Sequence, residues 1–226
     1  MTEQGSGTAV PRDSGAGTSG SLRAAQRMLQ LQNSLVELLR TKPFSQITYK
    51  EITEGVDIDR STVYRYYNHK NQVLQAAVDV RLTAFAFRLD LTFGRMETID
   101  GYTARLVDAW TELWLESGGL LAAASGLGAE PGPQRDWWRA RLEPWTEAVR
   151  EAIEVARFVE ELPRDGRPAR PLAELVMGTC LAAFNNELTV EHTPEHRRMV
   201  RDLLVDAVLR TMGRHRDASA GPRAPE

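Results

Sequence analysis

Cysteine is nearly absent from this sequence, because its 226 residues include only Cys180. A single cysteine excludes a disulfide within the chain and is typical of a reducing cytosol. Long apolar runs are missing as well, since no stretch reaches the roughly 18 apolar residues of a membrane span. The N-terminus also lacks the basic-then-apolar order of a signal peptide. We therefore expect a soluble, cytoplasmic protein without a membrane segment.

Signatures of catalysis and of cofactor binding are equally scarce. No P-loop, nucleophile elbow or pair of catalytic carboxylates is present, and Cys180 has no histidine partner at a diagnostic spacing. His192 and His196 are four residues apart, but Thr193-Pro194-Glu195 has the order of a helix cap followed by a first turn, which favours a helix start over a zinc site. The segment Gly15–Gly20 satisfies GxGxxG without a preceding strand. We predict no enzyme activity, no cofactor and no metal.

Strand patterns are also missing, and helical periodicity dominates, so the predicted fold is all-α with about nine helices in total. Residues 1–20 are rich in Gly, Ser and Thr and are predicted to form a disordered tail, as is the segment 214–226. Between the tails we expect a helix-turn-helix head at 21–70 and a larger helical domain at 71–213. Ser21 is predicted to cap the first helix, and Pro43 to enforce its end.

The stretch Phe44–Leu74, FSQITYKEITEGVDIDRSTVYRYYNHKNQVL, contains two short helical patterns separated by a tight turn. Thr48 is a suitable cap for the first pattern, and Asp59 for the second. Val63 and Tyr67 are expected to point inward, while the outward face of the second pattern carries small or basic polar groups. Such a face suits the major groove of DNA, where Arg reads guanine and Ser or Thr reads several bases.

This stretch resembles the helix-turn-helix of the tetracycline-repressor (TetR) family of transcription regulators. The family pattern is an Ile-Ala pair, a Gly-Val-Ser turn, small-Thr-aliphatic-Tyr-x-x-aromatic, and a Lys three residues later. The matching segments are Ile52-Thr53, Asp57-Ile58-Asp59, Ser61–Tyr67 and Lys70. The resemblance covers the first third of the chain, and it implies a DNA-binding repressor that dimerises through its last helices.

Ten residues of this stretch are the predicted DNA-binding residues. Base edges or the groove floor are assigned to Arg60, Ser61, Thr62 and Arg65. Phosphates are assigned to Thr48, Lys50, Tyr64, Tyr66, His69 and Lys70. From residue 21 to 81 nine Lys or Arg stand against six acids, a balance of +3 that leaves about −6 on the rest of the chain. A basic head on an acidic body fits contact with DNA at one end, although an ordinary solvated surface explains the balance nearly as well.

A long helix is predicted to begin at His69-Lys70-Asn71, with two neighbouring apolar stripes that include Val80 and Phe87. It would act as a lever between head and body. The next amphipathic helix is expected to begin at Tyr102 and to stop at Gly118-Gly119, before a short apolar segment, 120–127. Later helices are predicted around Trp138–Ala156, at about 172–190 and at Pro194–Met212.

All five tryptophans lie in the body, and an aromatic cluster with a few polar groups is a usual lining for an apolar or cationic ligand. The candidate effector-binding residues are Trp110, Trp114, Trp138, Trp145, Asn185 and Asn186. Two alternatives remain open at this stage: the rings form plain core, and the two asparagines lie on an exposed helix face.

The last two helices carry apolar residues on more than one face, which favours a homodimer with a four-helix interface. A two-fold dimer predicts a palindromic operator in double-stranded DNA. The favoured function is a repressor that releases this operator when a small molecule binds the C-terminal domain. The alternative is a small-molecule-binding or modifying protein, or a regulator acting through a protein partner, that keeps the helix-turn-helix as scaffold.

Overall fold

The computed structural model describes residues 15–54, 56, 66–89, 92–94, 96–187 and 193–214, and for 15–21 the backbone alone. These ranges contain seven α-helices, one 3-10 turn and no strand. The elements are α1 (Gly15–Leu39), η1 (Phe44–Gln46), α2 (Tyr49–Glu54), α4 (Lys70–Arg88), α5 (Ile99–Leu127), α6 (Pro133–Phe158), α7 (Ala169–Glu187) and α8 (Pro194–Thr211). The predicted all-α class is confirmed.

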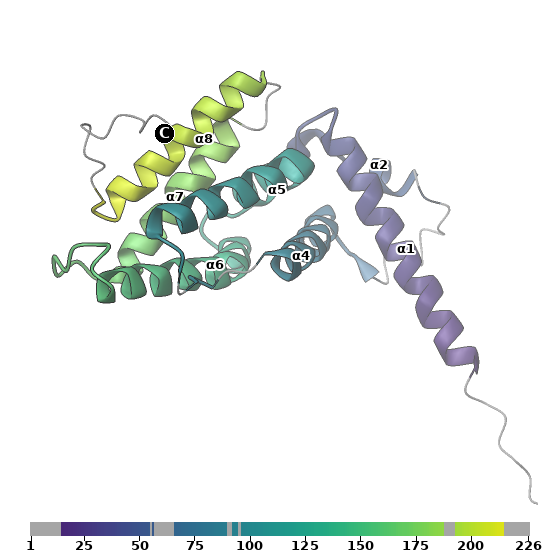
Figure 1. Cartoon of the computed structure of the whole chain (residues 1–226). Helices are drawn as coiled ribbons and strands as arrows, with labels where there is room; N and C mark the ends of the chain where they lie inside the picture. Colours follow the sequence, from purple (N-terminus) through teal and green to yellow (C-terminus); the bar gives the residue numbers. More distant parts are fainter. Residues whose placement is uncertain are drawn as a thin grey trace, which may run out of the picture.

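The helices form a head, a connecting helix and a body (Figure 1). The head consists of α1, η1, α2 and the start of α4, and the body consists of α5 to α8. Helix α4 packs on α1 at the head and on α5 in the body. Leu31 and Leu35 of α1 and Val73 and Leu74 of α4 are almost completely buried, so the head and α4 share one core. None of the described helices is long and apolar enough to span a membrane.

Helix α1 begins six residues earlier than expected. Its first residue is Gly15, so Ser21 lies inside the helix and does not cap it, and residues 15–20 are not part of a disordered tail. Extending an existing helix adds one hydrogen bond for each residue that is fixed, whereas nucleation is costly. A helix that is anchored at Leu31 and Leu35 can therefore continue into a segment of low helix propensity.

Helix α5 continues through the glycine pair that was predicted to stop it. The backbone is non-helical only at Ser117, with φ −139° and ψ 19°, and the helix then runs on to Leu127. At Gly119 an added Cβ would lie 3.0 Å from the carbonyl oxygen of Leu39. The glycine therefore allows the second half of α5 to pass close to the end of α1, and the predicted break is a kink.

The apolar surface of α4 is only partly buried. Leu82 and Phe85 are buried, but Val80 and Phe87, which were assigned to the inward stripe, are 48% and 88% exposed. The buried residues of α4 lie on the side that packs on α1 and α5. On the body side, Asp79 accepts two hydrogen bonds from the Arg141 guanidinium of α6, one of them at 3.0 Å.

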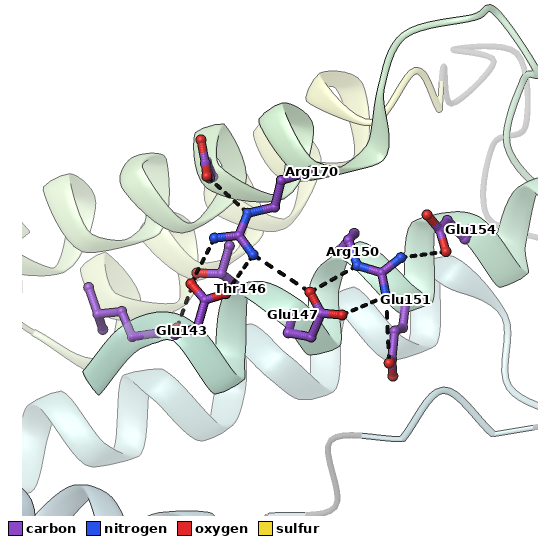
Figure 2. A network of polar contacts seen from close by, with 9 residues as sticks. Glu143, Thr146, Glu147, Arg150, Glu151, Glu154 and Arg170 are labelled. Atoms are coloured by element: carbon purple, nitrogen blue, oxygen red, sulfur yellow. Dashed lines mark hydrogen bonds and ion pairs between the residues drawn. The ribbon is translucent and has the colours of Figure 1, made fainter. Parts of the chain in front are cut away.

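Helices α6 and α7 are joined by a surface network of ion pairs (Figure 2). The Arg170 guanidinium of α7 donates to both carboxylate oxygens of Glu143 on α6, at 2.6 and 2.7 Å. It also lies 3.6 Å from Glu147, which accepts from Arg150 of its own helix. The hydrogen bonds from these guanidinium groups lower the pKa of Glu143 and of Glu147. The network holds the start of α7 on α6.

Candidate DNA-binding head and effector site

Thr48 and Glu51 cap the first turn of α2 reciprocally. The Thr48 hydroxyl accepts from the Glu51 N–H at 3.3 Å, and the Glu51 carboxylate accepts from the Thr48 N–H at 2.8 Å. This is a capping box, in which two otherwise unpaired helix donors are satisfied. Lys42 lies in the connector between α1 and α2 (residues 40–48, including η1) and also donates to Glu51. The Lys42 hydrogen bond, followed by those from Thr48, lowers the pKa of Glu51 to about 2.

Tyr67 fixes the entry into α4 from two sides. Its hydroxyl accepts from the buried Gln32 side chain of α1 at 3.2 Å, and its carbonyl accepts from the Tyr49 hydroxyl of α2. The ring is 9% exposed, which confirms the predicted inward position. One residue therefore connects three elements of the head. Val63, the other predicted inward residue, lies outside the described residues.

Lys70 is bound within the head instead of facing outward. Its ammonium donates to the carbonyls of Phe44 at 2.8 Å and Ile47 at 2.7 Å, with a longer contact to Ser45 at 3.5 Å. It also lies 4.6 Å from the centroid of the Phe44 ring. A phosphate contact, as predicted from the sequence, would require the ammonium to leave these acceptors. The geometry thus assigns Lys70 to joining the start of α4 to η1.

Replacing Lys70 by methionine is expected to lower the free energy of unfolding by about 1–3 kcal/mol, because partly buried carbonyls lose their donor. Methionine keeps a similar unbranched apolar stem. Urea denaturation followed by circular dichroism measures the change. Lys50→Met on the exposed face of α2 is the matched control, with an expected effect within about 0.5 kcal/mol. Equal stability of the two variants would contradict the joining role of Lys70.

The predicted DNA-binding residues fall into two groups. Five of them lie outside the described residues, namely Arg60, Ser61, Thr62, Tyr64 and Arg65. Of the others, Thr48, Lys50, Tyr66 and His69 are exposed, and Lys70 is partly buried. Lys50 forms an exposed ion pair with Glu54 at 3.3 Å, and such a pair contributes little to stability. The side chains of Lys50, Tyr66 and His69 are therefore accessible from solvent, whereas Thr48 is engaged in the capping box and Lys70 is bound to the carbonyls of η1.

An aromatic cluster connects α4, α5, α6 and α7 in the body. The Trp145 ring is stacked on Phe85 with 5.0 Å between centroids, and it meets Trp110 edge to face at 5.2 Å. Trp114 lies 6.3 Å from Trp110 and is stacked on Phe184 at 5.5 Å. These five rings are all nearly completely buried. The cluster is therefore an element of the core that extends from Phe85 of α4 to Phe184 of α7.

Several buried polar atoms in this region have no hydrogen-bond partner among the described residues. They include the indole N–H groups of Trp110 and Trp114, whose residues are 2% and 1% exposed, and the hydroxyl of Tyr102. Burial raises the pKa of Tyr102 to about 12, so this hydroxyl stays protonated. Buried polar groups usually have partners, and those without one are candidates for binding a ligand or water. Trp110 and Trp114 are thus donors available to an acceptor that enters the body.

The remaining candidate effector residues are dispersed. Asn185 is half-buried and donates to the Ser125 hydroxyl at 3.0 Å, which connects α7 to α5. Asn186 is exposed, so it does not face the aromatic cluster. Trp138 packs on Gly128 after α5, where an added Cβ would lie 2.7 Å from the ring. The structure therefore brings Trp110, Trp114 and Trp145 together and leaves Asn186 outside.

Three interactions of the head were not anticipated from the sequence. They are the Lys42–Glu51 pair, the Gln32–Tyr67 hydrogen bond and the binding of Lys70 to η1. The partner role of Glu51 in the capping box was also missed, although the spacing Thr48-x-x-Glu51 was an available signal for it. The other contacts join residues 9 to 35 positions apart, and no short-range pattern indicates them.

No family model matches the chain. It is 28% identical to the HTH-type transcriptional regulator EthR of Mycolicibacterium smegmatis over 141 residues, which cover 60% of this chain and 63% of that protein. The match thus spans less than two thirds of the length of this curated relative.

Solved structures extend the comparison to most of the chain. A protein from a Rhodococcus species assigned to the TetR family has a TM-score of 0.68 at 14% identity, over 83% of this chain and 99% of that one. The regulator FadR from Bacillus subtilis, in complex with stearoyl-CoA, has a TM-score of 0.62 at 16% identity, over 78% of this chain and 97% of that one. The resemblance predicted from the helix-turn-helix motif is confirmed, and the chain has the fold of the TetR-family transcription regulators.

Proposed function

We propose that this chain is a transcription regulator that binds a palindromic operator as a homodimer and releases it when a small molecule binds the body. The observation that carries the proposal is the set of contacts that hold the helices of the head together. The Thr48–Glu51 capping box, Tyr67 and Lys70 hold together α1, α2 and the start of α4, which precede and follow, along the chain, the segment that matches the recognition pattern. The head then corresponds to residues 21–70 and the effector and dimerisation domain to 71–213.

DNA contacts are assigned by position and accessibility. Arg60, Ser61, Thr62 and Arg65 read base edges, and Tyr64 contacts a phosphate beside them. The accessible side chains of Lys50, Tyr66 and His69 contact phosphates, which position the head without reading sequence. Thr48 contributes through its place at the start of α2. The cytoplasmic location predicted from the sequence is part of this proposal, because the protein must share a compartment with its operator.

An exposed apolar face on α7 and α8 supports dimerisation. Leu175 of α7 and Met199 and Leu203 of α8 are 57%, 51% and 62% exposed in the single chain. Gly178 is open, since an added Cβ there would meet no atom within 4 Å. In Figure 1, α7 and α8 belong to the side of the body away from α1, so a dimer through them leaves both heads accessible. A two-fold axis there pairs two heads with two operator half-sites.

The effector site is proposed at the aromatic cluster of the body. Trp110 and Trp114 supply buried N–H groups that have no partner in the described part of the chain, Trp145 supplies an aromatic wall, and Asn185 lies on the adjacent α7. Phe85 connects this cluster to α4, which begins in the head at Lys70. A ligand that displaces these rings would therefore shift α4, and with it the head. FadR from Bacillus subtilis, which is similar in fold, was solved in complex with stearoyl-CoA, and this supports a ligand-binding role for the present chain.

Selection of bound sequences from a random DNA pool, at a stated salt concentration, tests the function. The expected result is an enriched inverted repeat, because a two-fold dimer presents the same head to both half-sites. Absence of any enriched repeat at low salt would overturn the DNA-binding proposal. It would favour the alternative in which the helix-turn-helix is scaffold for a binding protein.

Arg65→Ala is expected to relax the base preference of the selected operator at one position in each half-site. The expected loss is about 1–3 kcal/mol of discrimination, the usual contribution of one bidentate Arg–base contact. Lys50→Met is the matched phosphate variant, which should weaken binding to all sequences and reduce the salt slope by about one. Binding titrations on operators changed one base pair at a time measure both. Uniform weakening by Arg65→Ala would contradict its role in reading bases.

A further inference from the structure

A hollow of about 680 Å³ lies between the head and the second half of α5, apart from the aromatic cluster. We name it the junction cleft. Its head side is formed by Leu39, Lys42, Pro43, Phe44 and Ser45, and its body side by Gly119, Ala122, Ala123, Gly126, Leu127 and Glu130. Small-molecule sites in proteins usually have volumes of about 300–1,000 Å³. The junction cleft therefore has the size of a small-molecule site.

The kink in α5 and its small side chains create this space. Helix α5 approaches the end of α1 closely at Gly119 and then continues past the connector to α2. The side of α5 that faces the connector carries mainly glycine and alanine, whose short side chains leave the space between α5 and the connector unfilled. At Gly126 an added Cβ would meet no atom within 4 Å. The cleft is therefore open where Gly126 lies and bounded by Leu39 and Phe44 on the opposite side.

The charges of the cleft indicate which ligands it would bind. Of the residues that line it, only Lys42 and Glu130 are charged. The Lys42 ammonium is paired with Glu51, and Glu130 is exposed at the rim. A charged ligand would lose hydration without gaining an unpaired buried charge as its partner. The walls are mostly apolar, and Ser45 is available at the surface of the cleft.

We propose that the junction cleft is a second small-molecule site, which binds uncharged, largely apolar molecules of the size of an anilinonaphthalene. A bound molecule contacts the connector of the head and α5 together. It therefore restrains the head relative to the body. The binding itself does not depend on the proposed DNA-binding function. Only the consequence for operator affinity rests on it.

The test uses a cysteine introduced into the cleft. Cys180 is buried, and burial raises its pKa to about 12, so the only native thiol reacts slowly with thiol reagents. In Ser45→Cys, the rate of reaction with 5,5′-dithiobis(2-nitrobenzoate) reports access to the cleft. The probe is N-phenyl-1-naphthylamine, an uncharged molecule. At roughly ten times its dissociation constant it is expected to slow the reaction about tenfold.

Three comparisons make the result specific. Adding Gly126→Leu, which fills the open part of the cleft, is expected to abolish the protection. Gln46→Cys, on the exposed surface next to Ser45, is expected to show no protection. The sulfonate 8-anilinonaphthalene-1-sulfonate, with the same rings and a negative charge, should protect more weakly than the neutral probe.

Other results would overturn the proposal. Protection that persists after Gly126→Leu, or that is equal at Gln46→Cys, would locate the probe elsewhere. Stronger protection by the sulfonate would contradict the uncharged class. Protection that rises with protein concentration in the absence of probe would show that a second copy of the chain covers the cleft. If operator selection fails but the Gly126-dependent protection is still observed, the small-molecule site is established and only the DNA-binding function is overturned.

Discussion

Replacing Trp145 by alanine is expected to lower the free energy of unfolding by about 3–5 kcal/mol, the usual cost of removing a fully buried large aromatic ring. Trp145 is 2% exposed and contacts Phe85 of α4 and Trp110 of α5, so its loss leaves a cavity among three helices. The two ring pairs add a contribution beyond buried area alone. Because these contacts lie where α4 enters the body, the substitution also weakens the attachment of α4 to the body.

Urea denaturation at a fixed protein concentration, followed by circular dichroism, measures this loss. Val155→Ala is a matched control on the same helix, because Val155 is 42% exposed, and its effect should be within about 0.5 kcal/mol. A loss below about 1 kcal/mol for Trp145→Ala would mean that the ring contributes little to the core. Such a result would contradict the role of Trp145 in joining α4 to the body.

Leu203→Glu on α8 is expected to convert the proposed dimer to monomer. Leu203 is 62% exposed in the single chain, so glutamate fits the monomer without strain. Within an interface its carboxylate would be buried without a partner, which is costly. A penalty of about 3 kcal/mol for the dimer interface would raise the dimer dissociation constant more than a hundredfold.

Sedimentation velocity over a range of concentrations measures the shift, and circular dichroism verifies that the variant is folded. Val80→Glu on α4 is the control, because Val80 is 48% exposed but lies outside the proposed face. The control should remain dimeric and bind the operator normally. A Leu203→Glu variant with unchanged dimerisation would exclude this part of α8 from the interface.

Local rules predicted several features of the helices correctly. Thr193 caps α8, with its hydroxyl accepting from the His196 N–H at 3.2 Å, and Pro194 occupies the first turn, as the order Thr-Pro-Glu indicated. His192, the other member of the rejected zinc pair, lies outside the described residues. Thr48 likewise caps α2. Capping depends on side chains within three residues of each other, so the sequence contains all the information that is needed.

Predictions that depended on packing were less successful. Gly118-Gly119 was expected to stop a helix, because glycine has low helix propensity, but α5 continues past α1 with a kink at Ser117. Propensity is a weak prior that tertiary contacts can override. Val80 and Phe87 were assigned to a buried stripe, yet both are exposed. Periodicity shows that a helix has an apolar side but not how far neighbouring helices cover it.

The sequence by itself determined the all-α class, the caps at Thr48 and Thr193, the buried position of Tyr67 and the resemblance carried by the helix-turn-helix motif, because these depend on residues close together in the chain. Only the tertiary structure decided that Lys70 binds the carbonyls of Phe44 and Ile47, that three tryptophans from α5 and α6 form one cluster, and that a cleft separates the connector from α5. These features join distant segments. Their geometry is set by how whole helices pack, which no local pattern of residues specifies.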